Sequence, residues 1–196
     1  MKTLITEFIS LDGVVQAPGA PEEDTDGGFT HGGWSIKYFD PLVMGGQYAK
    51  LAAQSDALLQ GRRTYQVSAA AWPDRSEDVF SDWINNVQKY VVSNTLTNED
   101  ITWAPTTIIR GDDFVKAVSD LRARPGGYIY VYGSAMMVRS LFDADLVDEL
   151  LLTIEPVILG GGKTIFAANG KALPFELAST EIASTGAQVC RYVRAR

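Results

Sequence analysis

The sequence predicts an α/β protein with three layers, in which helices flank a mostly parallel central sheet and an antiparallel hairpin follows at the C-terminus. Two observations carry this prediction. Apolar and β-branched runs alternate with helical patterns through residue 142, an arrangement typical of parallel βαβ units. Two later strand patterns, 175–182 and 187–193, are separated only by a turn near Gly186, which indicates a hairpin. With 196 residues, no internal repeat and no low-complexity linker, the chain is expected to form a single domain over residues 1–196.

The individual elements follow from local patterns. Strands are expected over 3–11, 57–60, 89–93, 106–109 and 128–132, with an extended apolar segment over 147–159. Helices are expected over 46–55, from about 62–64 onward, and over 81–87, 112–123 and 135–142, with Asp112 as the cap of the helix over 112–123. Between Asp12 and Trp34 the chain is rich in glycine, proline and acidic residues, which predicts either a functional loop or a solvated acidic loop. The tail strand over 187–193 is expected to be an exposed sheet edge.

Composition excludes several classes of function. Lys and Arg number 17 against 24 Asp and Glu, so the net charge is −7, and no basic run offsets it. Such a chain has no electrostatic surface for nucleic acid or for an anionic membrane. Cys190 and His31 are the only cysteine and histidine, which leaves no internal disulfide and no Cys/His zinc site. No segment has the pattern of a membrane span or a leader sequence, so the expected location is the cytoplasm.

The segment Gly160-Gly-Gly-Lys-Thr164 looks like a phosphate-binding loop but fails on its spacing. A P-loop requires the pattern G-x-x-x-x-G-K-[ST] followed by a helix, whose amides bind the phosphates. Here Val157 stands where the first glycine belongs, and the residues after Thr164 form a poor helix pattern. We therefore expect a tight turn or loop at this segment.

Three strand ends carry small or polar residues. Gly61-Arg-Arg-Thr64 directly follows a buried strand pattern, and Ser93-Asn94 and Gly133-Ser-Ala135 follow two others. Glycine permits a close approach of the backbone to a phosphate, a helix start presents free amides, and arginine grips a phosphate with paired hydrogen bonds. Because open parallel sheets bind ligands beyond the carboxyl ends of their strands, the three ends predict a dinucleotide site. A pair of surface arginines is the structural alternative.

Taken in order, these strand ends and the segments around them resemble the dihydrofolate reductase-like superfamily over about residues 3–193. The nearest part of that superfamily is the reductase domain of riboflavin biosynthesis with its single-domain relatives. The segments that carry the resemblance are Ser10–Gly13, Leu59–Tyr65, Tyr90–Asn94, Tyr130–Ser134, Val147–Leu150, Glu155–Gly162 and Lys163–Phe166. Their order and spacing match the α/β fold expected above.

The resemblance implies NADPH as the cofactor, and the composition above leads us to expect no metal. It also implies positions for the parts of the cofactor. The implied cofactor-binding residues are Gly61, Arg62, Arg63 and Thr64 at the adenosine phosphates, Ser93 and Asn94 at the adenine ribose, and Gly133, Ser134 and Ala135 at the pyrophosphate.

Four residues are candidates for supplying or relaying the proton that a reductase needs: Asp12, Asp40, Thr153 and Glu155. Asp12 ends the first strand, and an Asp-Gly turn is its alternative role. Asp40 lies near the place where dihydrofolate reductases carry their substrate carboxylate, but before Pro41 it also suits a helix cap. Thr153 and Glu155 lie in the segment whose family counterpart touches substrate. Burial of Glu155 in an apolar strand would raise its pKa, which suits a general acid.

The expected function is that of an NADPH-dependent reductase acting on a small heteroaromatic or carbonyl substrate, pteridine-like or pyrimidine-like. The models for this are 5-amino-6-(5-phosphoribosylamino)uracil reductase and dihydrofolate reductase. A non-catalytic nucleotide- or drug-binding module on the same fold is the alternative. The acidic loop Glu22–Asp26 places negative charge where a phosphorylated substrate would need cations. A homodimer is expected, because most soluble oligomers are symmetric and relatives pair through their sheets.

Overall fold

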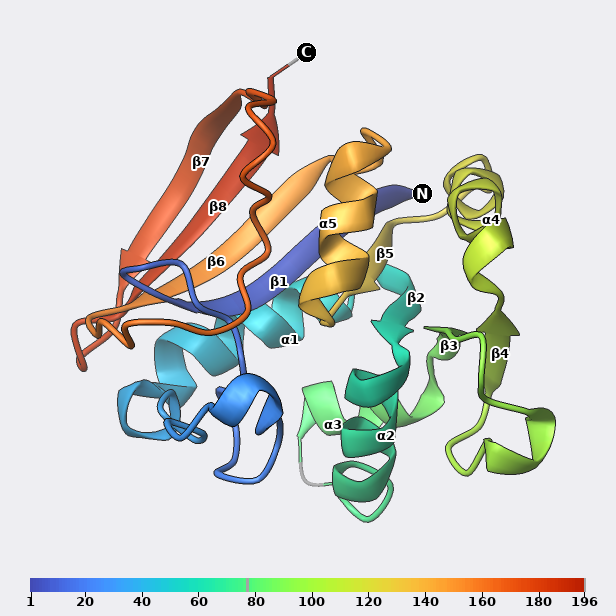
Figure 1. Ribbon diagram of the computed structural model, residues 1–196, viewed down its shortest axis with the longest axis horizontal. Helices are drawn as coiled ribbons and strands as arrows, with labels where there is room; N and C mark the ends of the chain where they lie inside the picture. The colour runs from blue at the N-terminus through green and yellow to red at the C-terminus, as the bar shows by residue number, and fades with distance from the viewer. Residues whose placement is uncertain (77, 196) are drawn as a thin grey trace. The chain divides into compact units, whose positions relative to one another are not determined.

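The computed structural model describes residues 1–76 and 78–195, and the chain forms two compact units (Figure 1). Unit 1 comprises Met1–Ile5 and Gln47–Asp148, and unit 2 comprises Thr6–Gly46 and the chain from Glu149 onward. Strand β1, Lys2–Ser10, contributes residues to both units. The expectation of a single domain stays a prediction.

Unit 1 contains a parallel sheet with strand order β4-β3-β2-β5-β1. Its further strands are β2 Ser55–Gly61, β3 Gln88–Val92, β4 Thr106–Ile109 and β5 Tyr128–Val131. All 4 residues of β5 and 6 of the 7 residues of β2 are buried, as expected of parallel strands covered on both faces. The predicted alternation of strands and helices is confirmed here.

Helices connect the strands of unit 1: α1 Gly46–Ala52, α2 Arg62–Ala71, α3 Val79–Asn86, α4 Phe114–Arg122 and α5 Ala135–Asp143. The helix expected over 46–55 ends at Ala52, because Ser55 opens β2 and donates its hydroxyl to the Leu51 carbonyl at 2.7 Å. The expected cap at Asp112 is wrong. Residues Gly111–Asp113 form a 3-10 turn, in which Asn94 Oδ1 accepts the Gly111 N–H at 2.7 Å, and α4 begins only after it.

Unit 2 contains the C-terminal antiparallel strands, in the order β1-β6-β8-β7. They are β6 Glu149–Glu155, β7 Phe175–Ile182 and β8 Gln188–Arg194, and β8 pairs antiparallel with both neighbours. The predicted hairpin is confirmed, but the predicted exposed edge at residues 187–193 is wrong. The edge strand is β7, exposed over residues 176–182, because β8 buries Val189 and Cys190 between its two partners.

The extended segment expected over 147–159 forms a strand only from Glu149 to Glu155. Pro156 follows this strand, and a proline has no N–H to donate to a strand ladder. Beyond it the chain stays close to the start of the protein, because the Leu11 N–H donates to the Val157 carbonyl at 2.8 Å. The turn after β1 and the segment after β6 are therefore neighbours in unit 2.

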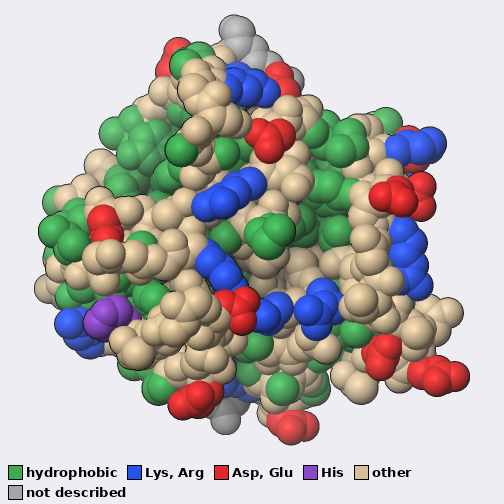
Figure 2. All heavy atoms as spheres, in the orientation of Figure 1, with side chains coloured by type: hydrophobic (Ala, Val, Ile, Leu, Met, Phe, Trp, Pro, Cys, Tyr) green, Lys and Arg blue, Asp and Glu red, His purple; other side chains and the backbone are tan. Residues whose placement is uncertain are grey.

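Together the strands form an eight-stranded, mostly parallel sheet with helices and antiparallel C-terminal strands, which confirms the predicted α/β class. Among the described residues, every helix is too short or too polar to cross a membrane. On the face drawn in Figure 2, Lys and Arg side chains lie in small groups among Asp and Glu, and no broad basic surface forms on that face.

Candidate active site

The turn from β2 to α2 forms the first part of a pocket in unit 1. Gly61 is both the last residue of β2 and the residue before the first turn of α2. It makes no side-chain cap, and the first turn of α2 holds no acidic residue, so the helix dipole is not neutralised there by a side chain. A Cβ at Gly61 would lie 2.3 Å from Ser134 Oγ, so only glycine fits at this approach.

The turn from β5 to α5 lies directly against this first turn. The Gly61 N–H donates to the Gly133 carbonyl at 3.2 Å. Gly133 has φ +60°, and a Cβ there would lie 2.7 Å from Thr64 Oγ1. Ser134, which precedes α5, makes no side-chain cap. The N-termini of two helices without side-chain caps therefore meet at backbone distance, a geometry that favours anionic groups.

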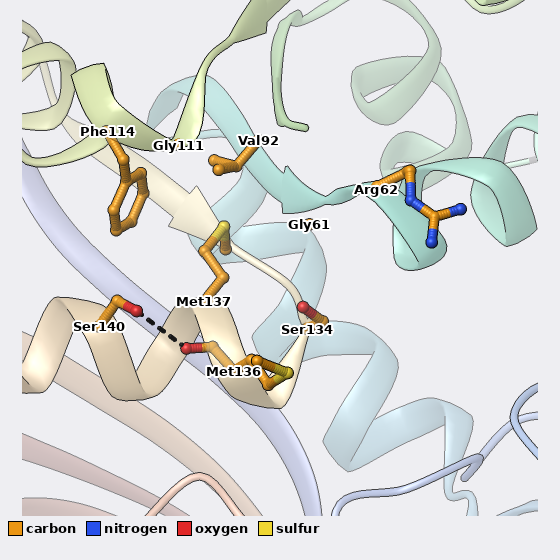
Figure 3. A pocket seen from close by; sticks show the side chains of 9 residues that line it. All are labelled: Gly61, Arg62, Val92, Gly111, Phe114, Ser134, Met136, Met137 and Ser140. Atoms are coloured by element: carbon orange, nitrogen blue, oxygen red, sulfur yellow. Dashed lines mark hydrogen bonds between the residues drawn. The ribbon is translucent and has the colours of Figure 1, made fainter. Parts of the chain in front are cut away.

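A pocket of about 250 Å³ opens beside these turns (Figure 3). Its lining residues are Gly61, Arg62, Val92, Gly111, Phe114, Ser134, Met136, Met137 and Ser140. Figure 3 shows Val92, Phe114 and Met137 on one side and the Arg62 guanidinium projecting from α2 on the other. Binding pockets for whole ligands usually measure about 300–1,000 Å³. This pocket therefore suits one part of a dinucleotide, with an apolar wall for a ring and a cationic edge for a phosphate.

Of the residues predicted to bind cofactor, Gly61, Arg62 and Ser134 line the pocket. The others lie in the same turns without lining it: Arg63, Thr64, Ser93, Asn94, Gly133 and Ala135. Asn94 accepts from Gly111, a lining residue, whereas the Ser93 hydroxyl accepts the N–H groups of Thr95 and Leu96 at 3.1 and 2.9 Å within its own turn. The structure thus brings the three predicted strand ends to one edge of the unit 1 sheet.

Sequence reasoning missed several lining residues, namely Val92, Gly111, Phe114, Met136, Met137 and Ser140. Gly111 and Phe114 follow the end of β4, so the rule applied to the other strand ends would have found this turn. Met136, Met137 and Ser140 lie on α5, and no sequence signal distinguishes them from ordinary helix residues.

In unit 2, Asp12 holds the segment that carries the three glycines. Its Oδ1 accepts the Ser10 hydroxyl at 2.6 Å and the Leu159 N–H at 3.1 Å, and its Oδ2 accepts the Gly160 N–H at 2.8 Å. The hydrogen bond from Ser10 is the main cause that lowers the pKa of Asp12. Asp12 is thus an ionised carboxylate that holds the turn by hydrogen bonds, and its geometry does not favour a role as proton donor.

Asp40 has its carboxylate oxygens bound to hydrogen-bond donors. Oδ1 accepts the N–H groups of Leu42 and Val43 at 2.9 and 3.2 Å, which caps a π-helical turn over Pro41–Gly45. Oδ2 accepts the Ser184 N–H at 2.9 Å and its hydroxyl at 2.8 Å. The Ser184 N–H is the largest of the causes that lower the pKa of Asp40 to about 2. The cap alternative foreseen before Pro41 is the one that this geometry favours.

Glu155 differs from Asp12 and Asp40, because its pKa is raised rather than lowered. It is fully buried at the end of β6, and its Oε1 accepts the Ser35 hydroxyl at 2.6 Å. Its Oε2 is buried without a hydrogen-bond partner among the described residues. Burial raises the pKa of Glu155 to about 7, against the opposing effects of the Ser35 hydroxyl and the Lys37 charge. The group is thus poised to hold a proton near neutral pH.

Thr153, the remaining candidate, lies two residues before Glu155 on β6, so both side chains point to the same face of that strand. It is completely buried. Trp34, which precedes Ser35, is also buried and donates its ring N–H to the Gln16 carbonyl at 2.8 Å. Of the four predicted acid–base residues, the geometry thus favours Glu155, with Thr153 on the same face.

Solved structures place the chain in the dihydrofolate reductase-like fold class. A candidate riboflavin biosynthesis protein from Shewanella sp. PV-4 is 22% identical, with 100% of both chains covered and a TM-score of 0.77. Dihydrofolate reductase from Enterococcus faecalis, solved in complex with NADP(H), is 13% identical, with 100% of this chain and 97% of that chain covered and a TM-score of 0.62.

The family follows from the sequence comparison. The model of the RibD C-terminal domain matches residues 2–190, so the chain belongs to the RibD C-terminal domain family. The uncharacterized protein YyaP of Bacillus subtilis (strain 168) is 30% identical over 138 residues, which cover 68% of this chain and 71% of YyaP. The resemblance inferred from the strand ends is confirmed at the level of family and fold.

Proposed function

We propose that the protein is an NADPH-dependent reductase that transfers a hydride to a small heteroaromatic or carbonyl substrate, pteridine-like or pyrimidine-like. The observation that carries this proposal is the pocket of unit 1, where the N-termini of α2 and α5 meet without side-chain caps beside the exposed Arg62. A dinucleotide phosphate offers anionic groups and an aromatic ring, which are the groups that this pocket fits. Membership of the RibD C-terminal domain family supports the same class of reaction.

The residues of the three strand ends fit such a cofactor. A Cβ at Gly61 or Gly133 would collide with Ser134 or Thr64, so glycine at both positions lets the two turns approach each other closely beside the pocket. We assign Gly61, Arg62, Arg63 and Thr64 to the adenosine phosphates, Ser93 and Asn94 to the adenine ribose, and Gly133, Ser134 and Ala135 to the pyrophosphate. When bound, the cofactor supplies the hydride.

Glu155 is the residue that we assign to the proton. A neutral carboxyl near neutral pH carries the proton that the product needs, and the raised pKa of Glu155 keeps it in that form. Ser35 orients the carboxyl through Oε1, which leaves Oε2 for the transfer. We assign Thr153 as a second polar group on the same face of β6 as Glu155. Asp12 and Asp40 stabilise the surrounding turns.

The test of the cofactor assignment compares NADPH with NADH. Arg62 is expected to contact the phosphate that distinguishes NADPH, and a charged hydrogen bond contributes about 1.5–3 kcal/mol. Arg62→Ala should therefore weaken NADPH binding by about 10- to 150-fold and leave NADH binding nearly unchanged, as measured by quenching of tryptophan fluorescence. Arg63→Ala is measured beside it. If neither substitution changes the NADPH:NADH affinity ratio, the assignment to this turn is wrong.

The complete burial of Glu155 favours one alternative, a non-catalytic nucleotide- or drug-binding module. A carboxyl group that no substrate reaches delivers no proton. The two functions differ in whether the near-ultraviolet absorbance of bound NADPH falls when pteridines or pyrimidines are added. A fall that depends on Glu155 supports the reductase, and no fall with any of them supports the binding module.

We also propose a homodimer. The edge strand β7 leaves residues 176–182 exposed, and pairing such an edge with another chain removes an aggregation hazard. Equilibrium sedimentation at micromolar concentration should show twice the mass of the chain. A species of single-chain mass alone would contradict this.

A further inference from the structure

The acidic segment between β1 and α1 folds into a closed loop in unit 2. The Gly33 N–H donates to the Ala17 carbonyl at 2.8 Å, and the Ser35 N–H donates to the Pro18 carbonyl at 3.1 Å, so the two ends of the loop meet. Inside the loop the chain is closely packed, since a Cβ at Gly32 would lie 2.3 Å from the Pro21 carbonyl oxygen. Residues 18–32, which lie between these ends, therefore have the closed form of an Ω-loop.

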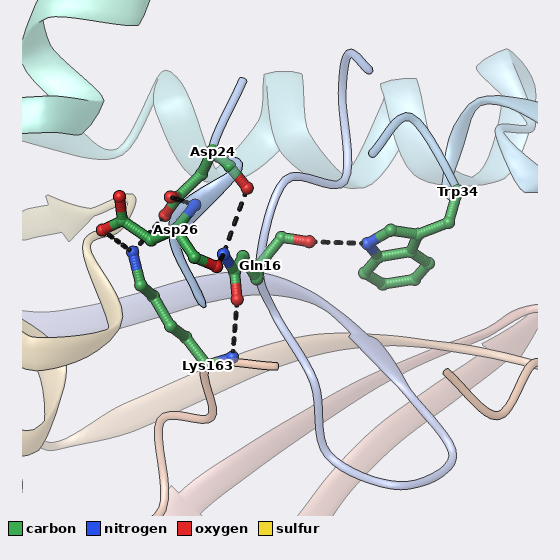
Figure 4. Close-up of polar contacts among 5 residues, drawn as sticks. All are labelled: Gln16, Asp24, Asp26, Trp34 and Lys163. Atoms are coloured by element: carbon green, nitrogen blue, oxygen red, sulfur yellow. Dashed lines mark hydrogen bonds and ion pairs between the residues drawn. The ribbon is translucent and has the colours of Figure 1, made fainter. Parts of the chain in front are cut away.

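Lys163 ties the tip of this loop to the segment that follows the three glycines. Its Nζ lies 2.5 Å from Asp24 Oδ2 and 2.8 Å from Asp26 Oδ2 (Figure 4). Gln16 joins the same network, because its Nε2 donates to the carbonyl oxygens of Asp24 and Asp26 at 3.1 and 3.0 Å. Its Oε1 accepts the Lys163 N–H at 3.0 Å. The segment Gly160–Thr164, whose spacing does not match a phosphate-binding loop, thus holds the acidic loop through its lysine.

The base of the loop reaches the candidate proton donor. Trp34 donates to the carbonyl of Gln16, the same residue that bonds to Lys163, and Figure 4 shows Gln16 between the two. The next residue, Ser35, is buried and donates its hydroxyl to Glu155 Oε1 at 2.6 Å. One continuous network therefore leads from Lys163 through Gln16 and the loop base to Glu155.

We propose that Lys163 is a positioning residue for Glu155: by holding the loop tip through Asp24 and Asp26, it keeps the loop base at Trp34 and Ser35 in place, with the Ser35 hydroxyl on that carboxyl group. This inference rests on the proposed function only in naming Glu155 as the proton donor. The ion pair suits the task because it is partly shielded, with side-chain exposures of 34% for Lys163 and 14% for Asp24. Shielded pairs keep more of their attraction than fully exposed pairs do.

The proposal makes opposite predictions for two kinds of variant. Release of the loop would let water reach Glu155, and because burial is the main cause that raises its pKa, the pKa should fall toward its ordinary value. Loss of the Ser35 hydroxyl alone, with the loop still held, should raise the pKa, because that hydroxyl stabilises the ionised form. Lys37 is the charged side chain that also acts on Glu155, and neither variant removes its charge.

The experiment titrates Glu155 directly in the cofactor-free protein, by NMR of ¹³C-labelled glutamate carboxyl groups assigned with Glu155→Gln. Lys163→Met should lower the pKa of Glu155 by about one unit or more, whereas Ser35→Ala should raise it. Lys163→Arg should stay near wild type, since it keeps the charge. Lys116→Met is the matched control, because Lys116 forms an ion pair with Asp120 at 2.6 Å on the surface of α4.

Each result decides the proposal. An unchanged pKa in a folded Lys163→Met variant would overturn it, and so would an equal shift in Lys116→Met. If Lys163→Met does not fold, Asp26→Asn removes one half-exposed partner of the lysine and should shift the pKa in the same direction by less. Should Glu155→Gln keep full hydride transfer, the proton-donor role is wrong, while the titration still decides whether Lys163 positions the carboxyl.

Discussion

In unit 1 the candidate cofactor pocket offers its charge at the surface, whereas in unit 2 the candidate proton donor is a carboxyl group withdrawn from water. Arg62 is exposed beside two helix N-termini without side-chain caps. Glu155 is fully buried, and burial raises its pKa to about 7. The contrast shows that the proposed reaction makes two different demands. An anion is bound by groups that stay charged, and a proton is delivered by a group whose charge burial suppresses.

The carboxyl groups of unit 2 repeat this contrast on a smaller scale. Asp12 and Asp40 accept several hydrogen bonds each, and these bonds lower the pKa of both groups. Glu155 accepts one hydrogen bond, and burial outweighs it. A carboxylate satisfied by N–H groups holds a turn together, whereas one left partly unsatisfied keeps its proton.

The largest expected effect is on the rate of hydride transfer in Glu155→Gln. General acid catalysis contributes about 10²- to 10⁴-fold, so the rate should fall by that factor while NADPH binding in unit 1 stays the same. The proton donor must be protonated to act. The wild-type rate should therefore decline as the pH rises through about 7, and this decline should be absent from the residual rate of the variant. Single-turnover kinetics across the pH range measure both.

Asp12→Asn is the matched control for this prediction. It removes a carboxylate that holds Leu159 and Gly160, but it leaves Glu155 unchanged. The rate should fall much less, and the pH dependence should stay. If Asp12→Asn abolished the decline near neutral pH and Glu155→Gln did not, the contrast between the two carboxyl groups would be reversed.

A smaller effect is expected for Gly133→Ala, on cofactor affinity. Gly133 has φ +60°, and the new Cβ would lie 2.7 Å from Thr64 Oγ1. Strain of this kind costs about 1–3 kcal/mol, so NADPH binding should weaken by about 5- to 150-fold as the turn moves away from α2. Calorimetric titration with NADPH measures the change.

Gly160→Ala separates strain from contact in the same measurement. Gly160 has φ +77° and nothing within 4 Å of a new Cβ, and it belongs to unit 2. The backbone strain is similar, but the cofactor pocket is untouched. Equal losses of NADPH affinity in the two variants would show that the pocket of unit 1 is not the binding site.

The buried carboxyl should also make stability depend on pH. The folded pKa of Glu155, about 7, lies above the ordinary value of 4.5, so the folded state binds this proton more tightly than the unfolded chain. Its contribution to the free energy of unfolding is present below about pH 4.5 and is lost as the pH rises through about 7. The change is on the order of 3 kcal/mol at about 1.36 kcal/mol per unit. Urea unfolding of wild type and Glu155→Gln should differ in slope over this range, and equal slopes would contradict the raised pKa.

The smallest effect is expected from Lys89, a buried cation of unit 1. Burial lowers its pKa from 10.5 to about 8, so its contribution to stability is fully present above about pH 10.5 and is lost as the pH falls through about 8. At about 1.36 kcal/mol per unit the shift corresponds to about 3 kcal/mol, and the carbonyls of Asn85 and Val87 and the Trp103 ring reduce the net effect by stabilising the charged form. In urea unfolding, the free energy of unfolding of the wild type should therefore rise between about pH 8 and pH 10.5. Lys89→Met should lack this rise, whereas Lys116→Met should keep it.

Local patterns were sufficient for most of the fold and for the turns that form the candidate cofactor pocket. A glycine that follows an apolar run and precedes a helix pattern defines Gly61 and Gly133 without any distant contact. The same rule extends to Gly111, which follows the predicted strand over 106–109 but was not among the predicted strand ends of the site. The prediction of an exposed edge at residues 187–193 was wrong. Whether β7 or β8 forms the edge depends on which of them pairs with β6, and strand order is not a local property of the sequence.

The sequence by itself determined the fold class, the family and the strand ends that form the pocket, because short-range steric and hydrophobic patterns encode them. Only the tertiary structure decided which carboxyl group is suited to hold a proton. Ser35 and Glu155 are 120 positions apart, and Lys163 and Asp24 are 139 apart. The pKa of a carboxyl group depends on the water and the donors around it, and the fold brings those neighbours from distant parts of the chain.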